Sequence, residues 1–212
     1  MDEITISALL ARAKDGDRSA VGELFDAQRA RLERMLALRI DGRLRGRIEA
    51  ADVIQDSFVE ASRRLDEYLL EPAMPFYLWL RFITVQRLHS VYREHLGAKR
   101  RDARREVRLD AGASTGATSE ALAARLLGKL STPSRGMMRA ELRAQLREIL
   151  ESMDPNDREI IALRHFEQLG NVDASRVLGL EPSAASKRYV RAIRRLRELL
   201  ARIPGMAEYP WS

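Results

Sequence analysis

Residues 171–203 read NVDASRVLGLEPSAASKRYVRAIRRLRELLARI, and this stretch decides the fold of the C-terminal part of the chain. A short helical segment leads into a turn centred on Gly179, and a longer helix follows. Apolar residues of the second helix recur at steps of three and four, which is the spacing of one buried helix face: Ala185, Tyr189, Ala192, Ile193, Leu196, Leu199, Leu200 and Ile203. Two helices joined by such a turn predict a helix-turn-helix.

The other side of the second helix is cationic, with Lys187, Arg188, Arg191, Arg194 and Arg195. A helix that is held by one face and carries cations on the other suits a DNA groove. Phosphates attract the guanidinium groups, and base edges accept hydrogen bonds from them. The alternative is a solvated surface helix or a coiled-coil strand. The short helix and the glycine turn favour DNA binding.

The composition is that of a folded protein without redox or thiolate chemistry. The chain has 212 residues, of which 45% are hydrophobic, and no cysteine. This length allows one or two domains. No apolar run approaches the roughly 18 residues of a transmembrane span, and the acidic N-terminus does not resemble a secretory signal. We therefore expect a cytoplasmic location and no membrane association.

The net charge of +6 is unevenly distributed along the sequence. Residues 76–108 hold 9 Lys and Arg against 3 Asp and Glu, and residues 176–202 hold 8 against 2. Each block therefore has a net charge of +6, whereas residues 1–75 hold 12 against 15. Two separated basic blocks indicate two nucleic-acid contacts.

Hydrophobic periodicity predicts an all-α protein of two small helical domains joined by a flexible linker, because no stretch shows sustained β alternation. We expect domains at 1–108 and 137–203, the linker at 109–136 and a tail at 204–212. The predicted helices cover about 17–40, 50–68, 76–96, 138–152 and 154–167, followed by the helix-turn-helix, with a short helix at about 119–130 in the linker. Asp17 and Asp154 are the predicted N-caps of two of them.

Three segments resemble the bacterial sigma-70 family. DVIQDSF (52–58) resembles the helix of that family that binds core RNA polymerase. FYLWLRFITVQRL (76–88) is similar to the helix that binds and melts the −10 element, and residues 163–199 are similar to the −35-binding module. Two modules with no middle domain between them resemble the extracytoplasmic-function (ECF) group.

The resemblance implies a sigma factor that binds the β and β′ subunits of core RNA polymerase and directs promoter recognition, DNA melting and transcription initiation. It implies promoter DNA as a partner and an anti-sigma factor as a candidate regulator. It implies no cofactor, no metal and no catalytic residue in this chain. The first domain corresponds to sigma region 2 and the last to region 4.

The polymerase-binding residues implied by the resemblance are Asp52, Gln55 and Asp56. They lie within one helical turn and share a face opposite the apolar stripe of Ile54 and Phe58. Exposed carboxylates and an amide can dock on a basic polymerase surface. The alternative is an acidic pair that complements the dipole at the start of a helix.

For the −10 element the resemblance implies a flipped base held by the loop at 69–74, where Leu70 and Met74 line the pocket. The alternative is that this loop only connects two helices. Trp79 is either a wedge beside the melted pair or, as its apolar row favours, a core residue. The DNA single strand exposed by melting would run along Gln86, Arg87 and Arg93. The basic residues within 99–105 would add attraction for its phosphates. Val85 and Gln86 depart from the basic residue and Asn common in the family, so the −10 preference cannot be transferred.

For the −35 element, base contacts are expected near the start of the recognition helix, at Ser183, Ala184, Ser186 and Lys187. Base and phosphate contacts are expected at Arg188, Arg191, Arg194 and Arg195. Glu181 departs from the small polar N-cap usual in the family.

Other functions fit the sequence less well. The three histidines, His89, His95 and His165, form no metal-binding motif, and no glycine-rich phosphate loop is present. A two-metal nuclease built from Asp52, Asp56 and Glu60 is a remote alternative, because the same spacing makes a docking face. The main alternative is a stand-alone helix-turn-helix transcriptional regulator, and an adaptor bundle without DNA binding is the third hypothesis.

Overall fold

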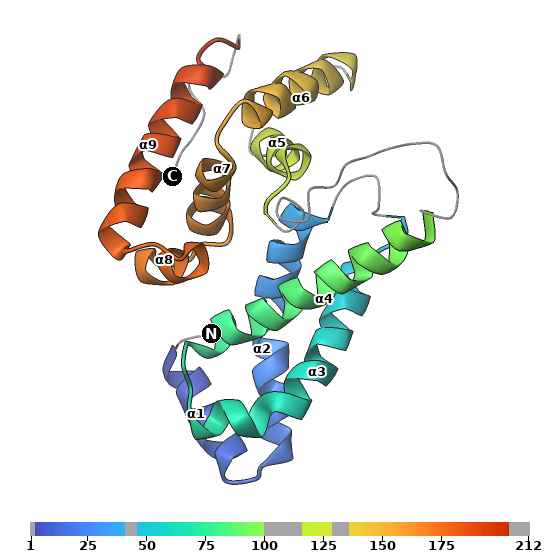
Figure 1. Ribbon diagram of the computed structural model, residues 1–212, viewed down its shortest axis with the longest axis vertical. Coiled ribbons are helices and arrows are strands. Elements are labelled where there is room, and N and C mark those ends of the chain that lie inside the picture. The colour runs from blue at the N-terminus through green and yellow to red at the C-terminus, as the bar shows by residue number, and fades with distance from the viewer. Residues whose placement is uncertain (1–2, 41–45, 100–115, 129–135, 204–212) are drawn as a thin grey trace. The chain divides into compact units, whose positions relative to one another are not determined.

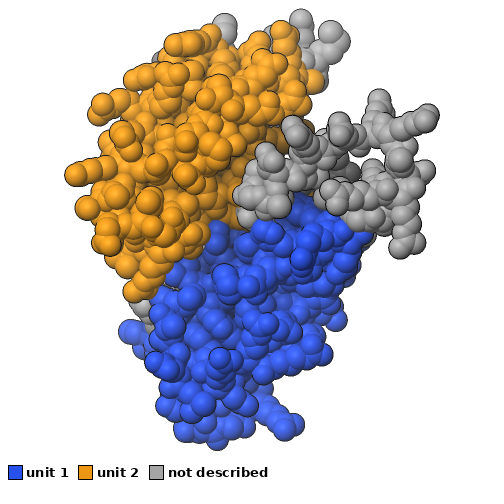
Figure 2. Space-filling model, viewed as in Figure 1, with its two compact units in different colours: residues 1–36, 46–110 blue, residues 37–45, 111–212 orange. Residues whose placement is uncertain are grey.

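The computed structural model describes residues 3–40, 46–99, 116–128 and 136–203, and all regular elements in these ranges are helices (Figure 1). The prediction of an all-α fold is therefore confirmed. The chain divides into two compact units (Figure 2). Unit 1 contains residues 1–36 and 46–110, and unit 2 contains residues 37–45 and 111–212.

Unit 1 is built from α1 (Glu3–Lys14), most of α2 (Arg18–Arg39), α3 (Ala50–Leu70) and α4 (Phe76–Lys99). Helices α3 and α4 pack along each other, and α1 packs against α3. The core is formed by fully buried aliphatic side chains, which include Leu24, Leu32, Ile54, Leu80 and Leu88. Helix α1 was not among the predicted helices, and it is anchored to unit 1 by the buried side chain of Leu9.

The start of α2 is fixed by Asp17, as the sequence predicts. The Asp17 carboxylate accepts hydrogen bonds from the backbone N–H of Ser19 (2.9 Å) and from its hydroxyl (2.6 Å), and it pairs with Arg12 (2.7 Å). The hydrogen bonds from Ser19 and Arg12 lower the pKa of Asp17 from 3.8 to about 2. The N-cap side chain of Asp17 is therefore negatively charged at pH values well above 2.

An aromatic cluster holds the loop between α3 and α4. The ring of Tyr68 stacks on Trp79 with centroids 4.6 Å apart and meets the edge of Phe76 at 5.7 Å. The Tyr68 hydroxyl donates a hydrogen bond to the carbonyl of Met74 (3.0 Å). Burial raises the pKa of Tyr68, so the hydroxyl stays protonated as a donor. The cluster therefore ties the end of α3 to the loop that precedes α4.

Unit 2 has one short helix from the predicted linker and a set of helices from the predicted C-terminal domain. These are α5 (Ser119–Gly128), α6 (Gly136–Glu151), α7 (Pro155–Ile161), a π-helical turn η1 (Ala162–Phe166), α8 (Asn171–Leu178) and α9 (Pro182–Leu200). Helix α5 packs on α6, and α9 packs on α6, α7 and α8. The short helix predicted at about 119–130 is confirmed, and its side chains at Leu122 and Leu126 are fully buried.

Unit 2 also encloses a buried ion cluster at Arg39, whose side chain is inaccessible to solvent. Arg39 pairs with Glu159 and, at 2.6 Å, with Glu167. Glu159 in turn accepts a hydrogen bond from the backbone N–H of Ala117 (2.7 Å). Burial alone would lower the pKa of Arg39, but the attraction of the two carboxylates outweighs it and raises the pKa. The guanidinium is therefore kept charged in the interior.

Two backbone features were not predicted from the sequence. The helix expected over 154–167 begins as predicted at Pro155, with Asp154 accepting a hydrogen bond from the N–H of Asn156 (2.8 Å). It then widens into the π-helical turn η1, and Gln168 follows in the left-handed region with φ 58°. Hydrophobic spacing over so short a segment does not distinguish an α-helical turn from a π-helical one.

Candidate polymerase-binding and DNA-binding faces

Unit 1 presents an acidic face on α3. Asp52, Gln55 and Asp56 are all exposed there, while Val53 and Ile54 on the opposite side are buried. By helical register the exposed Val59 lies at the centre of this face. We call Asp52, Gln55, Asp56 and Val59 the acidic face of α3. An apolar spot within a ring of polar groups is the composition of a protein-docking surface.

Asp56 is already paired within unit 1. Arg87 of α4 donates to its carboxylate through Nε (2.9 Å) and Nη2 (2.8 Å) and also pairs with Glu94 (3.3 Å). The hydrogen bond to Asp56, together with the attraction of both acids, raises the pKa of Arg87. One residue predicted to bind polymerase and one predicted to bind the −10 strand are therefore partners of each other.

The outer face of α4 carries the other −10 candidates. On a helix of 100° per residue, one strip of its surface contains Trp79, Phe82, Gln86, His89, Ser90 and Arg93. Arg87 lies outside this strip. The Phe82 ring is 52% exposed, and Gln86 and Arg93 are exposed as well. Burial and the nearby Arg93 lower the pKa of His89, so the fixed cation of this strip is Arg93.

Trp79 and the two loop candidates differ in their surroundings. Trp79 is half-buried and stacked on Tyr68, as its place in an apolar row favours. The side chain of Leu70, at the end of α3, is 81% exposed, whereas Met74 is half-buried with its carbonyl held by Tyr68. The pocket for a flipped base stays a prediction.

Unit 2 contains the helix-turn-helix formed by α8 and α9. Gly179 ends α8 in the left-handed conformation with φ 63°, and the N–H of Leu180 closes the turn on the carbonyl of Ser175 (2.9 Å). The side-chain amide of Asn171 donates to the carbonyl of Pro182 (2.7 Å), which ties the start of α8 to the start of α9. Glu181 precedes α9 but makes no side-chain capping hydrogen bond.

A cationic face runs along the exposed side of α9. Within about a third of the helix circumference lie Ser183, Ala184, Lys187, Val190, Arg191 and Arg194, all exposed. We call these six residues the cationic face of α9. Ser186 and Arg195 are exposed at its two borders, and Arg195 lies 3.8 Å from Glu198. Most of the predicted −35 residues are thus gathered on one surface.

Arg188 is directed elsewhere. It is half-buried, and its Nη1 pairs with Asp157 (2.8 Å) and Asp154 (3.2 Å) at the start of α7. Asp154 is also the N-cap of α7. Arg188 therefore holds α9 against α7 through two carboxylates, and by helical register it lies just beyond Arg195 at one border of the cationic face.

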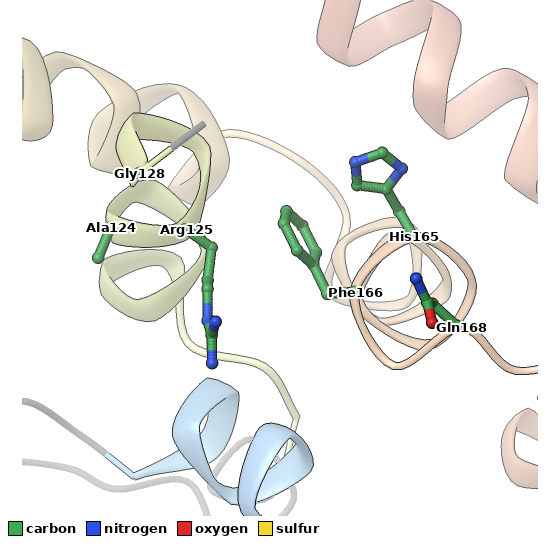
Figure 3. Close-up of a pocket in the computed structure, with 6 residues that line it drawn as sticks. All are labelled: Ala124, Arg125, Gly128, His165, Phe166 and Gln168. Carbon is green, nitrogen blue, oxygen red and sulfur yellow. The ribbon is translucent and has the colours of Figure 1, made fainter. Parts of the chain in front are cut away.

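A separate pocket of about 420 Å³ opens between α5 and η1 (Figure 3). It is lined by Ala124, Arg125, Gly128, His165, Phe166 and Gln168, and Phe166 projects from η1 toward α5. The π-helical turn and the left-handed Gln168 shape its floor. The mixed lining offers contact surface but brings no pair of carboxylates together for acid–base chemistry.

The described ranges contain neither a cluster of metal ligands nor a membrane-spanning helix. No three His, Cys, Asp or Glu side chains gather there in a way that could hold a metal ion. No helix there has the length and hydropathy of a transmembrane span.

The part of unit 2 that contains α8 and α9 is similar in sequence to a known family. Residues 143–196, about a quarter of the chain, match the sequence profile described as "Sigma-70, region 4". The C-terminal module is a sigma-70 region 4. The match runs from α6 to α9, so the helix-turn-helix and the cationic face lie inside region 4. This finding supports the resemblance of the C-terminal part of the chain to the sigma-70 family. A comparison with curated proteins gave no match.

Solved structures extend the likeness to the fold outside region 4. CnrH, solved in complex with the cytosolic domain of CnrY, is 24% identical with a TM-score of 0.55, over 94% of this chain and 99% of that chain. The sigma factor RpoE in complex with the anti-sigma factor NepR from Bartonella quintana is 19% identical with a TM-score of 0.45, over 90% and 98%. The likeness to CnrH shows that nearly the whole chain shares its all-α fold.

Three features of these surfaces were missed in the sequence. Phe82 and Val190 are apolar residues outside the predicted apolar rows, and both are exposed. The signal that could have identified them is their helical position, because at 100° per residue each lies on the same side of its helix as exposed cationic residues. The pairing of Arg87 with Asp56 joins residues 31 positions apart and leaves no trace in either local pattern.

Proposed function

We propose that this chain is an ECF-type sigma factor that binds core RNA polymerase and directs promoter recognition, DNA melting and transcription initiation. The observation that carries the proposal is a region 4 match that coincides with a folded helix-turn-helix whose exposed face is cationic. The −35 element would enter through its major groove. Lys187, Arg191 and Arg194 would meet phosphates and base edges there.

Core polymerase would bind the acidic face of α3. Asp52 and Gln55 support this assignment, because both are exposed on the surface of α3. Asp56 differs from these two residues, because its carboxylate already accepts a hydrogen bond from Arg87 and orients that side chain. We expect the β and β′ subunits to supply the basic partner surface.

The melted −10 strand would follow the outer face of α4. Gln86 and Arg93 supply a hydrogen-bonding group and a cation, and the exposed ring of Phe82 adds a stacking surface one turn before Gln86. This combination of aromatic rings and cations is typical of proteins that bind single-stranded nucleic acid. Leu70 and Met74 remain the proposed lining of a pocket for a flipped base.

The proposed factor makes and breaks no bond itself, needs no cofactor, and works in the cytoplasm. An anti-sigma factor is its proposed regulator. The solved complex of CnrH with the cytosolic domain of CnrY gives a precedent for a protein partner on this fold.

The test is promoter selection with a reconstituted enzyme. Purified bacterial core RNA polymerase is incubated with the chain and a library of randomised duplexes, and bound templates are sequenced and transcribed. We expect two conserved sequence blocks and transcripts that depend on the chain. Enrichment of one block by the chain alone, with no effect of polymerase, would contradict the proposal and favour the stand-alone regulator.

A point substitution tests the α4 part of the proposal. Phe82→Ala should weaken binding of the reconstituted enzyme to single-stranded −10 oligonucleotides by roughly tenfold, because stacking of one base on an aromatic ring is lost. Phe82→Tyr should bind like the wild type, as should the control Ile4→Ala, which removes an exposed apolar side chain from α1. Wild-type affinity in Phe82→Ala would exclude stacking at this position.

A further inference from the structure

One apolar side chain interrupts the cationic face of α9. Val190 is 53% exposed, although Lys187 and Arg191 lie one turn or less from it. Together with Ala184, these three residues line a shallow surface depression. An exposed valine side chain within a row of cations cannot bind a phosphate, but it can contact an apolar group of a bound ligand.

The major groove of DNA offers one such partner. The edges of the four bases present hydrogen-bond donors and acceptors there, and thymine alone adds an apolar group, the methyl on C5. Small apolar side chains contact this methyl, while neighbouring cations bind phosphates and guanine edges. Ala184 and Val190 supply the apolar contact, and Lys187 and Arg191 supply the charges.

We infer that Val190 reads the 5-methyl group of a thymine in the DNA bound by α9. This inference rests on the proposed function only insofar as α9 binds a specific duplex. It makes Val190 a determinant of sequence specificity, whereas Lys187, Arg191 and Arg194 determine affinity as well. The same methyl group occurs on 5-methylcytosine, so the two sources have to be distinguished.

The test removes one methyl group from the DNA and one side chain from the protein. In a duplex obtained by selection, each thymine of the block bound by α9 is replaced in turn by deoxyuridine. Binding is measured for the wild type, for Val190→Ala and for Val172→Ala, each with and without core polymerase. Val172 is the matched control, because it is a valine of the same helix-turn-helix with 51% exposure.

We expect one thymine whose replacement weakens binding of the wild type and of Val172→Ala by roughly fourfold, the ratio that corresponds to burial of one methyl group. Val190→Ala should bind both duplexes equally. The inference would be overturned if Val190→Ala lost as much affinity on this replacement as the wild type does. It would also be overturned if no replacement of a thymine weakened binding of the wild type. Tighter binding of 5-methylcytosine than of thymine at that position would overturn thymine as the source.

The two polymerase conditions separate this inference from the proposed function. Suppose that replacing the thymine weakens binding in the absence of polymerase, and that polymerase neither binds the chain nor changes this loss of affinity. The inference then stands and the sigma-factor proposal falls. If no duplex is selected under either condition, both fall.

Discussion

Neighbouring arginines of α9 have different tasks, and their partners decide which. Arg188 is held by Asp154 and Asp157 at the start of α7, so its charge serves the packing of region 4. Arg191 and Arg194 have exposed side chains on the cationic face. A guanidinium that is already paired has to lose that partner before it can bind a phosphate, whereas an exposed one exchanges only water and counterions.

Substitution separates these tasks. Arg188→Ala should lower the free energy of unfolding of unit 2 by about 1 kcal/mol, because two carboxylates lose a half-buried partner. Arg191→Ala should leave stability within about 0.5 kcal/mol and weaken DNA binding with a shallower salt dependence. Urea unfolding and salt titrations of DNA binding measure both. Unchanged stability of Arg188→Ala with lost DNA binding would return Arg188 to the DNA face.

At the scale of the element, the ends of helices carry much of the local information. The turn between α8 and α9 needs a residue with φ 63°, which glycine at position 179 adopts without steric strain. Gly22 lies within α2, and neither glycine has a neighbouring atom within 4 Å of an added Cβ. The two positions therefore differ in backbone conformation and not in available space.

Alanine at these two glycines should have opposite effects. Gly179→Ala should lower the free energy of unfolding by about 1 kcal/mol, since an L side chain is strained at positive φ. Gly22→Ala should raise it by about 0.5–1 kcal/mol, because alanine favours the helix. Denaturant unfolding of both variants gives the comparison. A stabilising Gly179→Ala would mean that the turn does not have this conformation in solution.

The cap of α2 predicts a pH dependence. Asp17 has a pKa lowered from 3.8 to about 2, so its charged form stabilises the folded state above about pH 4. That contribution is lost as the pH falls from about 4 toward 2, where the folded protein takes up the proton. Asp17→Asn keeps an N-cap but removes the charge.

The difference in melting temperature between wild type and Asp17→Asn should therefore be constant from pH 7 to about 4 and shrink below it. Thermal unfolding followed by circular dichroism provides the measurement. A difference that persists unchanged to pH 2.5 would show that the charge of Asp17 does not support the cap.

Local signals explain which elements the sequence could predict. Asp17 and Asp154 are N-caps, Pro75 precedes α4, and Pro155 is the first residue of α7. These signals and the apolar rows of α3 and α9 each act within a few residues, and the corresponding helices agree with the structure. The burial of Arg39 against Glu159 joins residues 120 positions apart, and the short hydrophobic pattern of residues 162–166 does not distinguish a π-helical turn from an α-helical one. The pairs Arg87–Asp56 and Arg188–Asp157 each join residues 31 positions apart, so the local sequence patterns did not predict these contacts.

At the scale of the whole molecule, the chain divides its proposed work between two units. Unit 1 holds the acidic face of α3 and the outer face of α4, and unit 2 holds the cationic face of α9. Acidic and basic surfaces on separate elements suit two kinds of partner, a basic protein surface and a polyanion. The central claim is that the acidic face of α3 binds core RNA polymerase.

The most direct test is co-elution of the chain with core RNA polymerase on a sizing column at moderate salt. The wild type is compared with the triple variant Asp52→Ala, Gln55→Ala, Asp56→Ala. The control is Asp66→Ala with Glu67→Ala, which removes the same charge from exposed positions further along α3. A parallel Arg87→Ala variant separates loss of the Asp56–Arg87 pair from loss of the acidic face.

We predict stoichiometric co-elution for the wild type, the control and Arg87→Ala, and none for the folded triple variant. Failure of the folded wild type to associate with polymerase would contradict the account. Association that the triple variant retains would contradict the assignment of the acidic face of α3.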